Sequence, residues 1–178
     1  GNNQLNYTVN VLGKSKPDEI LNALNEGVTK ALRQTRISSS VKDGMDISLI
    51  SIDFKNRHLQ YAGAYSPLYV LRNGEIMQFP ADKFPVGGYM GEELRSFTLH
   101  EVEIQKGDVI YIFSDGFSDQ FGGPDDSKYL VKRFRELLMS IWKEPMDEQK
   151  EILNQVHLDW KGNRPQVDDI LVIGIRIG

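Results

Sequence analysis

The chain has 178 residues, of which 40% are hydrophobic and 26% are charged, and its formal net charge is −4. These values are typical of one globular domain and argue against a disordered chain. The acidic balance lacks the basic stripe that binds phosphate backbones, so we expect no nucleic-acid partner. The absence of cysteine excludes disulfide bonds and thiolate metal sites, and it is consistent with the cytoplasm.

The apolar runs of the sequence are short. The longest ones, Val109–Phe113 and Ile170–Ile173, fall far below the roughly 20 residues that span a bilayer. The N-terminus resembles no signal peptide, and Gly1 stands where a complete chain would begin with methionine. We therefore expect a cytoplasmic domain cut from a longer parent protein, which can carry a membrane anchor elsewhere.

Helical spacing marks the beginning of the chain. Apolar residues recur three or four positions apart behind Pro17 and two acids, which predicts a helix from Pro17 to about Arg33. Before it, Leu5, Val9 and Leu12 followed by Gly13 are consistent with the last turns of another helix.

Short β-rich runs follow between Asp46 and Phe113. They are DISLISIDF (46–54), RHLQYAG (57–63), LYVLR (68–72), EIMQF (75–79), SFTLHEVEI (96–104) and DVIYIF (108–113). Asn73–Gly74 stands between two of these runs and is the strongest short hairpin signal, because both residues tolerate positive φ. The region is therefore predicted to form antiparallel sheet.

Two helical stripes and a last strand complete the chain. The stripes run from Leu130 to Ile141 and from Ile152 to Trp160, and the strand runs from Ile170 to Ile177. Asp125–Asp126 are expected to cap a helix that starts near Ser127. The order of elements contains no alternating βα units, so it indicates a layered α+β domain.

Carboxylates stand at the ends of two predicted strands. Asp115 follows the run Val109–Phe113, and Asp168–Asp169 precede the run ILVIGIRI. If these strands pair antiparallel in the middle of a sheet, the carboxylates meet at one sheet edge. Carboxylates at such a short distance repel one another unless a proton or a cation lies between them. Among cations, Mg²⁺ and Mn²⁺ prefer oxygen ligands. Gly116 would let the backbone come close.

Several motifs carry a family resemblance that covers nearly the whole chain. They are SDGFSD (114–119), VDDILVIGIRI (167–177), DGMD (43–46), AGAYSPLYVLRNG (62–74), the KxPxG-like segment Lys83–Gly87 and KGDVIYIFSDGF (106–117). Together they resemble the SpoIIE-type branch of the bacterial metal-dependent (PPM, protein phosphatase 2C-like) serine/threonine phosphatases. The resemblance implies a four-layer α-β-β-α sandwich, that is, two antiparallel sheets flanked by helices.

The resemblance also implies a site and a reaction. Asp115 and Asp168 match the family's metal ligands, which act in catalysis by holding two Mn²⁺ or Mg²⁺ ions, and Gly116 belongs to the same motif. Asp169 stands where many relatives have asparagine, and Asp119 matches a ligand of a weaker third ion. The implied activity is that of a protein serine/threonine phosphatase, a hydrolase in which metal-activated water attacks a phosphoserine or phosphothreonine.

One motif of the family does not match. Its first aspartate–glycine metal motif would precede Leu5, so residues 1–178 are interpreted as a single phosphatase-like domain that lacks its first strands, an N-terminally truncated one. We expect weak metal binding, little activity and self-association through uncovered sheet edges. The implied partners are an upstream sensor domain and a phosphorylated substrate such as a STAS-domain anti-sigma antagonist.

Two other interpretations stay open. A noncatalytic phosphatase-like module that binds a partner in signalling would explain the missing metal motif. A calcium-binding structural domain predicts ligands at alternate positions of one loop, which SDGFSDQ does not supply.

Overall fold

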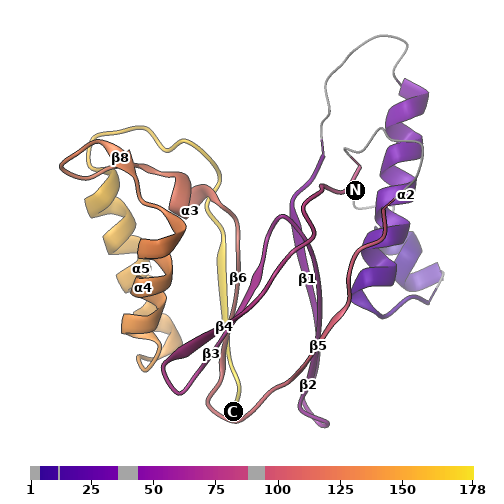
Figure 1. Cartoon of the computed structure of the whole chain (residues 1–178), viewed down its shortest axis with the longest axis horizontal. Coiled ribbons are helices and arrows are strands. Elements are labelled where there is room, and N and C mark those ends of the chain that lie inside the picture. Colours follow the sequence, from indigo (N-terminus) through magenta and orange to yellow (C-terminus); the bar gives the residue numbers. More distant parts are fainter. Residues whose placement is uncertain (1–4, 12, 36–43, 88–94) are drawn as a thin grey trace. The chain divides into compact units, whose positions relative to one another are not determined.

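The computed structural model describes residues 5–11, 13–35, 44–87 and 95–178. The chain forms two compact units, one of residues 1–68 and 79–104 and the other of residues 69–78 and 105–178. Figure 1 follows the elements of both units along the chain. Asp43, the first residue of the predicted DGMD segment, lies outside the described residues.

The first unit combines a helix with a three-stranded antiparallel sheet. A short π-helical turn, η1 (Tyr7–Val11), precedes the helix α2 (Pro17–Thr35). The strands β1 (Ile47–Asp53), β2 (His58–Ala64) and β5 (His100–Glu103) lie in the order β1-β2-β5. The helix predicted from Pro17 is confirmed, and its first turn carries Asp18 and Glu19, where carboxylates favour the helix dipole.

The core of the first unit lies between α2 and its sheet. Leu21 and Leu24 on one side of the helix are buried together with Ala62 and Ala64 of β2. Phe84 and Phe97 close this core, with ring centroids 4.6 Å apart. Burial of this apolar surface is the main stabilising term of the unit, at about 25 cal/mol per Å².

The four-stranded antiparallel sheet lies almost entirely in the second unit. Its strands are β3 (Leu68–Arg72), β4 (Glu75–Phe79), β6 (Val109–Phe113) and β9 (Val172–Arg176), in the order β4-β3-β6-β9. The turn between β3 and β4 has positive φ at Asn73 (52°) and Gly74 (85°), which confirms the predicted hairpin.

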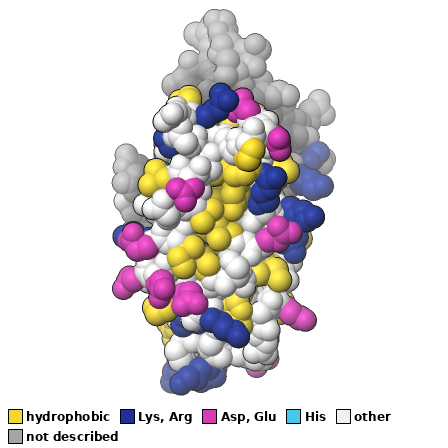
Figure 2. All heavy atoms as spheres, turned by 90° about the vertical axis from the view of Figure 1, so that its left-hand side faces the viewer, with side chains coloured by type: hydrophobic (Ala, Val, Ile, Leu, Met, Phe, Trp, Pro, Cys, Tyr) yellow, Lys and Arg dark blue, Asp and Glu magenta, His cyan; other side chains and the backbone are white. Residues whose placement is uncertain are grey.

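Two helices cover one face of this sheet (Figure 1). The helices α4 (Val131–Ile141) and α5 (Met146–Lys161) bury Phe134, Leu138 and Leu153 against Tyr111 of β6. The Tyr111 hydroxyl donates to Gln149 Oε1 of α5, and burial raises the pKa of Tyr111 to about 12. Figure 2 faces the outer side of these helices, where hydrophobic side chains form a band between acidic and basic ones.

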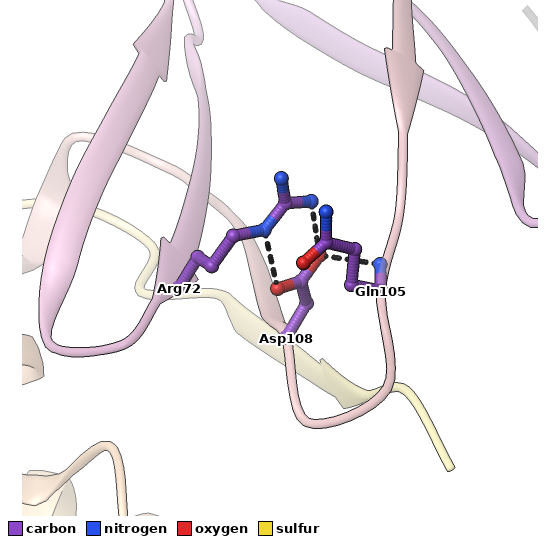
Figure 3. Close-up of polar contacts among 3 residues, drawn as sticks. All are labelled: Arg72, Gln105 and Asp108. Atoms are coloured by element: carbon purple, nitrogen blue, oxygen red, sulfur yellow. Dashed lines mark hydrogen bonds and ion pairs between the residues drawn. The ribbon is translucent and has the colours of Figure 1, made fainter.

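A buried ion pair holds β3 to the turn before β6 (Figure 3). Arg72 Nε and Nη2 lie 2.9 and 2.7 Å from the two carboxylate oxygens of Asp108, whose side chain is only 2% exposed. The backbone N–H of Gln105 donates to the same carboxylate at 2.8 Å. The two-pronged geometry fixes the arginine more firmly than a single contact would.

One predicted boundary is wrong. Ser127–Lys128 form strand β8, which pairs with β7 (Phe121–Gly122), and α4 begins only at Val131. Asp126 caps no helix: its φ is 49°, and its carboxylate accepts from Arg164 Nε at 2.6 Å. A tight turn therefore overrides the local cap signal.

The predicted α+β class, with antiparallel sheets flanked by helices, is confirmed. No helix within the described ranges is long and apolar enough to cross a membrane.

Candidate metal-binding site

The two strands that adjoin the candidate aspartates, β6 and β9, pair with each other. β6 and β9 run antiparallel, and Phe113 lies opposite Val172 in the register. The carboxyl end of β6 therefore lies beside the amino end of β9. The sequence predicted this meeting on the condition that the two strands pair antiparallel in the middle of a sheet. They pair antiparallel, but β9 lies at the edge of its sheet.

Ser114 joins the two acidic segments, a role that the sequence-based prediction missed. Its Oγ donates to the carbonyl oxygen of Asp169 at 2.8 Å and accepts from the N–H of Leu171 at 2.9 Å. Its own N–H donates to the carbonyl oxygen of Leu171 at 2.9 Å. The residue before Asp115 is thus bonded to the segment that carries Asp168 and Asp169. A serine directly before Asp–Gly at a strand end was the available signal.

Gly116 permits the close approach that the sequence led us to expect. A Cβ atom at this position would lie 2.5 Å from the carbonyl oxygen of Asp169, inside van der Waals contact. Because the opposing atom belongs to the backbone, it cannot rotate away as a side chain would. Only glycine therefore leaves the two segments this close.

The carboxylate of Asp115 faces solvent at the start of a single helical turn, α3 (Gly116–Asp119). Its backbone oxygen accepts from the N–H of Asp119 and from Ser118 Oγ, both at 2.9 Å. Its side chain is exposed and makes no capping bond to the turn. The helical turn fixes the backbone and leaves the carboxylate available.

Asp168 and Asp169 are also exposed, in the loop before β9. One carboxylate oxygen of Asp168 accepts from the N–H of Asp169 at 2.7 Å. The loop contains no helix or strand, so hydrogen bonds to its neighbours determine its position.

Asp119 is already paired. Its Oδ2 lies 2.8 Å from Lys128 Nζ, and both side chains are 42% exposed. A metal ion at Asp119 would have to compete with this ammonium group.

The chemistry of the donors fits Mn²⁺ or Mg²⁺, because Asp115, Asp168 and Asp169 offer only carboxylate oxygens. Within the described ranges, however, no group of three or more His, Cys, Asp or Glu side chains gathers closely enough to hold an ion. Asp115 and Asp168 as metal ligands therefore stay a prediction.

Several comparisons relate the chain to known proteins. The family model described as Stage II sporulation protein E (SpoIIE) matches residues 5–178. The SiaA-PP2C domain of Pseudomonas aeruginosa is similar in structure, with a TM-score of 0.85 and 25% sequence identity. That match covers 99% of this chain and 67% of the other. No curated protein sequence matches significantly.

Two further structures share the fold at lower identity. The phosphatase domain of SpoIIE from Bacillus subtilis, presoaked with Mn, has a TM-score of 0.60 and 15% identity, and the match covers 99% of this chain and 74% of that one. The structure of the RsbU and RsbW domains of a Mycobacterium tuberculosis protein has a TM-score of 0.66 and 20% identity. That match covers 98% of this chain and 45% of the other. With residues 5–178 matched by the family model and an antiparallel α+β fold shared with PP2C-type phosphatase domains, the chain belongs to the SpoIIE family.

Proposed function

We propose that the chain is a metal-dependent protein serine/threonine phosphatase domain that hydrolyses phosphoserine or phosphothreonine in a signalling protein. The observation that carries the proposal is the hydrogen-bonded contact between Ser114 and the segment of Asp169, in a chain of the SpoIIE family. Hydrolysis would move the phosphoryl group from the substrate's side-chain oxygen to water.

Asp115 and Asp168 are the residues proposed to hold the metal ions, with Asp169 beside them and Asp119 as a further candidate. Two bound Mn²⁺ or Mg²⁺ ions would lower the pKa of a water molecule and neutralise charge on the phosphoryl oxygens. The aspartates then act by position and charge, and Gly116 keeps their segments close. No nucleophilic side chain of this chain is required.

The proposed setting of the domain is cytoplasmic signalling. A phosphorylated protein substrate, of which a STAS-domain anti-sigma antagonist is one candidate, and an upstream sensor or regulatory domain are the proposed partners. The support is that one similar structure contains both RsbU and RsbW domains of a single protein.

The chain is also proposed to be part of a longer phosphatase domain. It spans 67% of the SiaA-PP2C chain and 74% of the manganese-soaked SpoIIE chain. Slow turnover by these 178 residues alone agrees with the finding that no three His, Cys, Asp or Glu side chains of the described residues gather to hold an ion.

A second candidate is a noncatalytic phosphatase-like module that binds a partner in a signalling protein. The same lack of a three-residue ligand group among the described residues favours it. The two candidates differ in one measurable property, which is turnover that depends on Mn²⁺ and on Asp115.

The test is a phosphatase assay with a phosphoserine peptide and a Mn²⁺ titration, on the chain and on the natural protein that contains it. Asp115→Ala is expected to lower kcat/KM by about 100-fold or more, because a ligand to the ions would be lost. Asp125→Ala, an exposed aspartate in the turn between β7 and β8, should leave it unchanged. Equal activity of Asp115→Ala and the unmodified protein would refute the proposal, and no turnover in either protein would favour the binding module.

A further inference from the structure

The loop that carries Asp168 and Asp169 is hydrogen-bonded at two points to residues 114–120, which we call the acidic turn. One tie is Ser114, directly before Asp115, and the other is Gln120, directly after α3. The ties hold the loop at Pro165 and at Asp169–Leu171, on both sides of Asp168. The loop has no regular secondary structure of its own, so these side chains provide contacts that a helix or sheet would otherwise supply.

Gln120 forms its tie to the loop from a fully buried position. It is 0% exposed, and its Nε2 donates to the carbonyl oxygens of Pro165 at 3.0 Å and of Phe121 at 2.9 Å. Its backbone oxygen accepts from Trp160 Nε1 at 3.0 Å and from the N–H of Tyr129 at 2.9 Å. Both the side chain and the main chain of Gln120 are therefore held in place.

Packing alone does not explain a glutamine at this position. The Oε1 atom of Gln120 is buried and has no hydrogen-bond partner among the described residues, and an unpaired buried acceptor costs about 1–3 kcal/mol. An apolar side chain of similar shape would avoid that cost. What the amide adds is its two donated bonds, to Phe121 and to Pro165, and the bond to Pro165 holds the loop.

Ser114 forms its tie to the loop by acting as donor and acceptor at once. Its hydroxyl bridges the carbonyl oxygen of Asp169 and the N–H of Leu171, at 2.8 and 2.9 Å. This bridge continues the β6–β9 pairing beyond Phe113 and Val172, where the ladder between the strands ends. It fixes the backbone on either side of Ile170.

We propose that Ser114 and Gln120 are positioning residues that set the spacing between Asp115 and the Asp168–Asp169 pair for metal binding. The inference rests on the proposed function, because it assigns to these residues a role at the same site. Carboxylates repel one another until a cation neutralises them, so an untethered loop would drift outward. Residues that orient metal ligands typically contribute 10–100-fold in metal affinity.

The experiment compares three variants with two matched controls. Ser114→Ala removes the hydroxyl bridge, Ser114→Thr keeps it, and Gln120→Met keeps the length of the side chain without the donor. Ser140→Ala removes an exposed serine bond to Leu137, and Gln149→Met removes a buried glutamine that bonds Tyr111, Trp142 and Glu144, away from the acidic turn. The Mn²⁺ dissociation constant is measured by electron paramagnetic resonance of free Mn²⁺, with urea unfolding alongside.

Ser114→Ala and Gln120→Met are expected to bind Mn²⁺ about 10–100-fold more weakly, and Ser114→Thr to recover most of the affinity. Hydrogen exchange at the Leu171 amide should be faster in Ser114→Ala, because the acceptor of that amide is lost. Gln149→Met removes a buried hydrogen-bonded amide, as Gln120→Met does, and should keep the Mn²⁺ affinity. If Gln120→Met does not fold, the pair of Ser114 variants decides the question.

The failures are distinguishable. Mn²⁺ binding that depends on Asp115 in the unmodified chain, with unchanged affinity in Ser114→Ala and Gln120→Met, would overturn the positioning role alone. If Gln149→Met lost as much Mn²⁺ affinity as Gln120→Met, the loss in both variants would follow from lower stability of the protein. That result would overturn the positioning role as well. Binding that Asp115→Ala leaves unaltered would overturn the metal proposal itself, and the positioning role with it.

Discussion

At the scale of the residue, the candidate site depends on small side chains at a contact between backbones. Gly116 allows the carbonyl oxygen of Asp169 to approach, and the Ser114 hydroxyl is short enough to bridge to the same segment. Behind this contact, Phe117 of α3 packs on His157 of α5, with ring centroids 5.6 Å apart. Both residues line a cavity of about 800 Å³ between α5 and β9.

His157 predicts a pH dependence of stability. Burial lowers the pKa of His157 below its ordinary value of about 6.5, and the positive charge of Lys161 lowers it further. The unfolded chain then takes up the proton first, so the stability that the neutral imidazole contributes is present above about pH 6.5 and is lost as pH falls through the lower folded pKa. Urea unfolding of the unmodified chain and of His157→Phe at pH 8, 7, 6 and 5 measures the difference.

The expected result is that the unmodified chain loses more stability than His157→Phe over that interval. Acidic residues titrate equally in both proteins, so they cancel in the difference. Parallel curves from pH 8 to 5 would contradict the prediction.

At the scale of the element, β6 is the strand that organises the second unit. It pairs with β3 on one side and with β9 on the other, and it leads directly into the acidic turn. The turn before it is held by Asp108, which binds Arg72 of β3 and the N–H of Gln105 (Figure 3). The start of β6 is therefore fixed by a buried charge, and its end by Ser114.

Asp108→Asn is expected to destabilise the second unit by about 3 kcal/mol, the low end of the cost of breaking a buried ion pair. The low end applies because the Arg72 side chain retains 23% exposure to water. The control is Glu26→Gln, which removes the charge from an exposed pair with Lys30 and should leave the stability nearly unchanged, because water screens exposed pairs. Urea unfolding followed by circular dichroism measures both, and equal small effects would show that the Arg72 pair contributes little.

At the scale of the whole molecule, the described chain leaves β9 at the edge of its sheet. β9 ends the order β4-β3-β6-β9, and near its start Leu171 and Ile173 are 57% and 39% exposed. An edge strand with exposed apolar side chains is a template for pairing with another chain. A second exposed apolar surface lies over α4 and α5, where Val131, Met139 and Leu158 are 49%, 42% and 47% exposed (Figure 2).

We expect the chain to self-associate through β9, as the sequence led us to predict for uncovered edges. Ile173→Lys should shift a sedimentation-velocity profile toward the monomer, because a charge on an edge strand disfavours pairing. Leu158→Lys, the matched control on α5, should leave the profile unchanged. Dispersal by Leu158→Lys and not by Ile173→Lys would place the interface on the helices, and a monomeric unmodified chain at all concentrations would refute self-association.

The sequence by itself determined the kinds of element and the family. Apolar spacing predicted α2, α4 and α5, Asn73–Gly74 predicted the hairpin, and the carboxylates beside two apolar runs predicted that Asp115 and Asp168 stand at neighbouring strand ends. These features depend on residues close together in the chain, or on a pairing rule that applies whatever the side chains are.

Only the tertiary structure decided how the acidic segments are held. The hydrogen bonds of Ser114 and Gln120 and the ion pair of Asp119 with Lys128 connect residues that no local sequence pattern connects. The start of α4 at Val131, later than the sequence predicted, was also decided by the tertiary structure. The cap signal of Asp125–Asp126 failed because the turn between β7 and β8 and the ion pair with Arg164 stabilise a different backbone. A local preference is worth about 1 kcal/mol, so contacts with distant residues that sum to more than that decide the outcome.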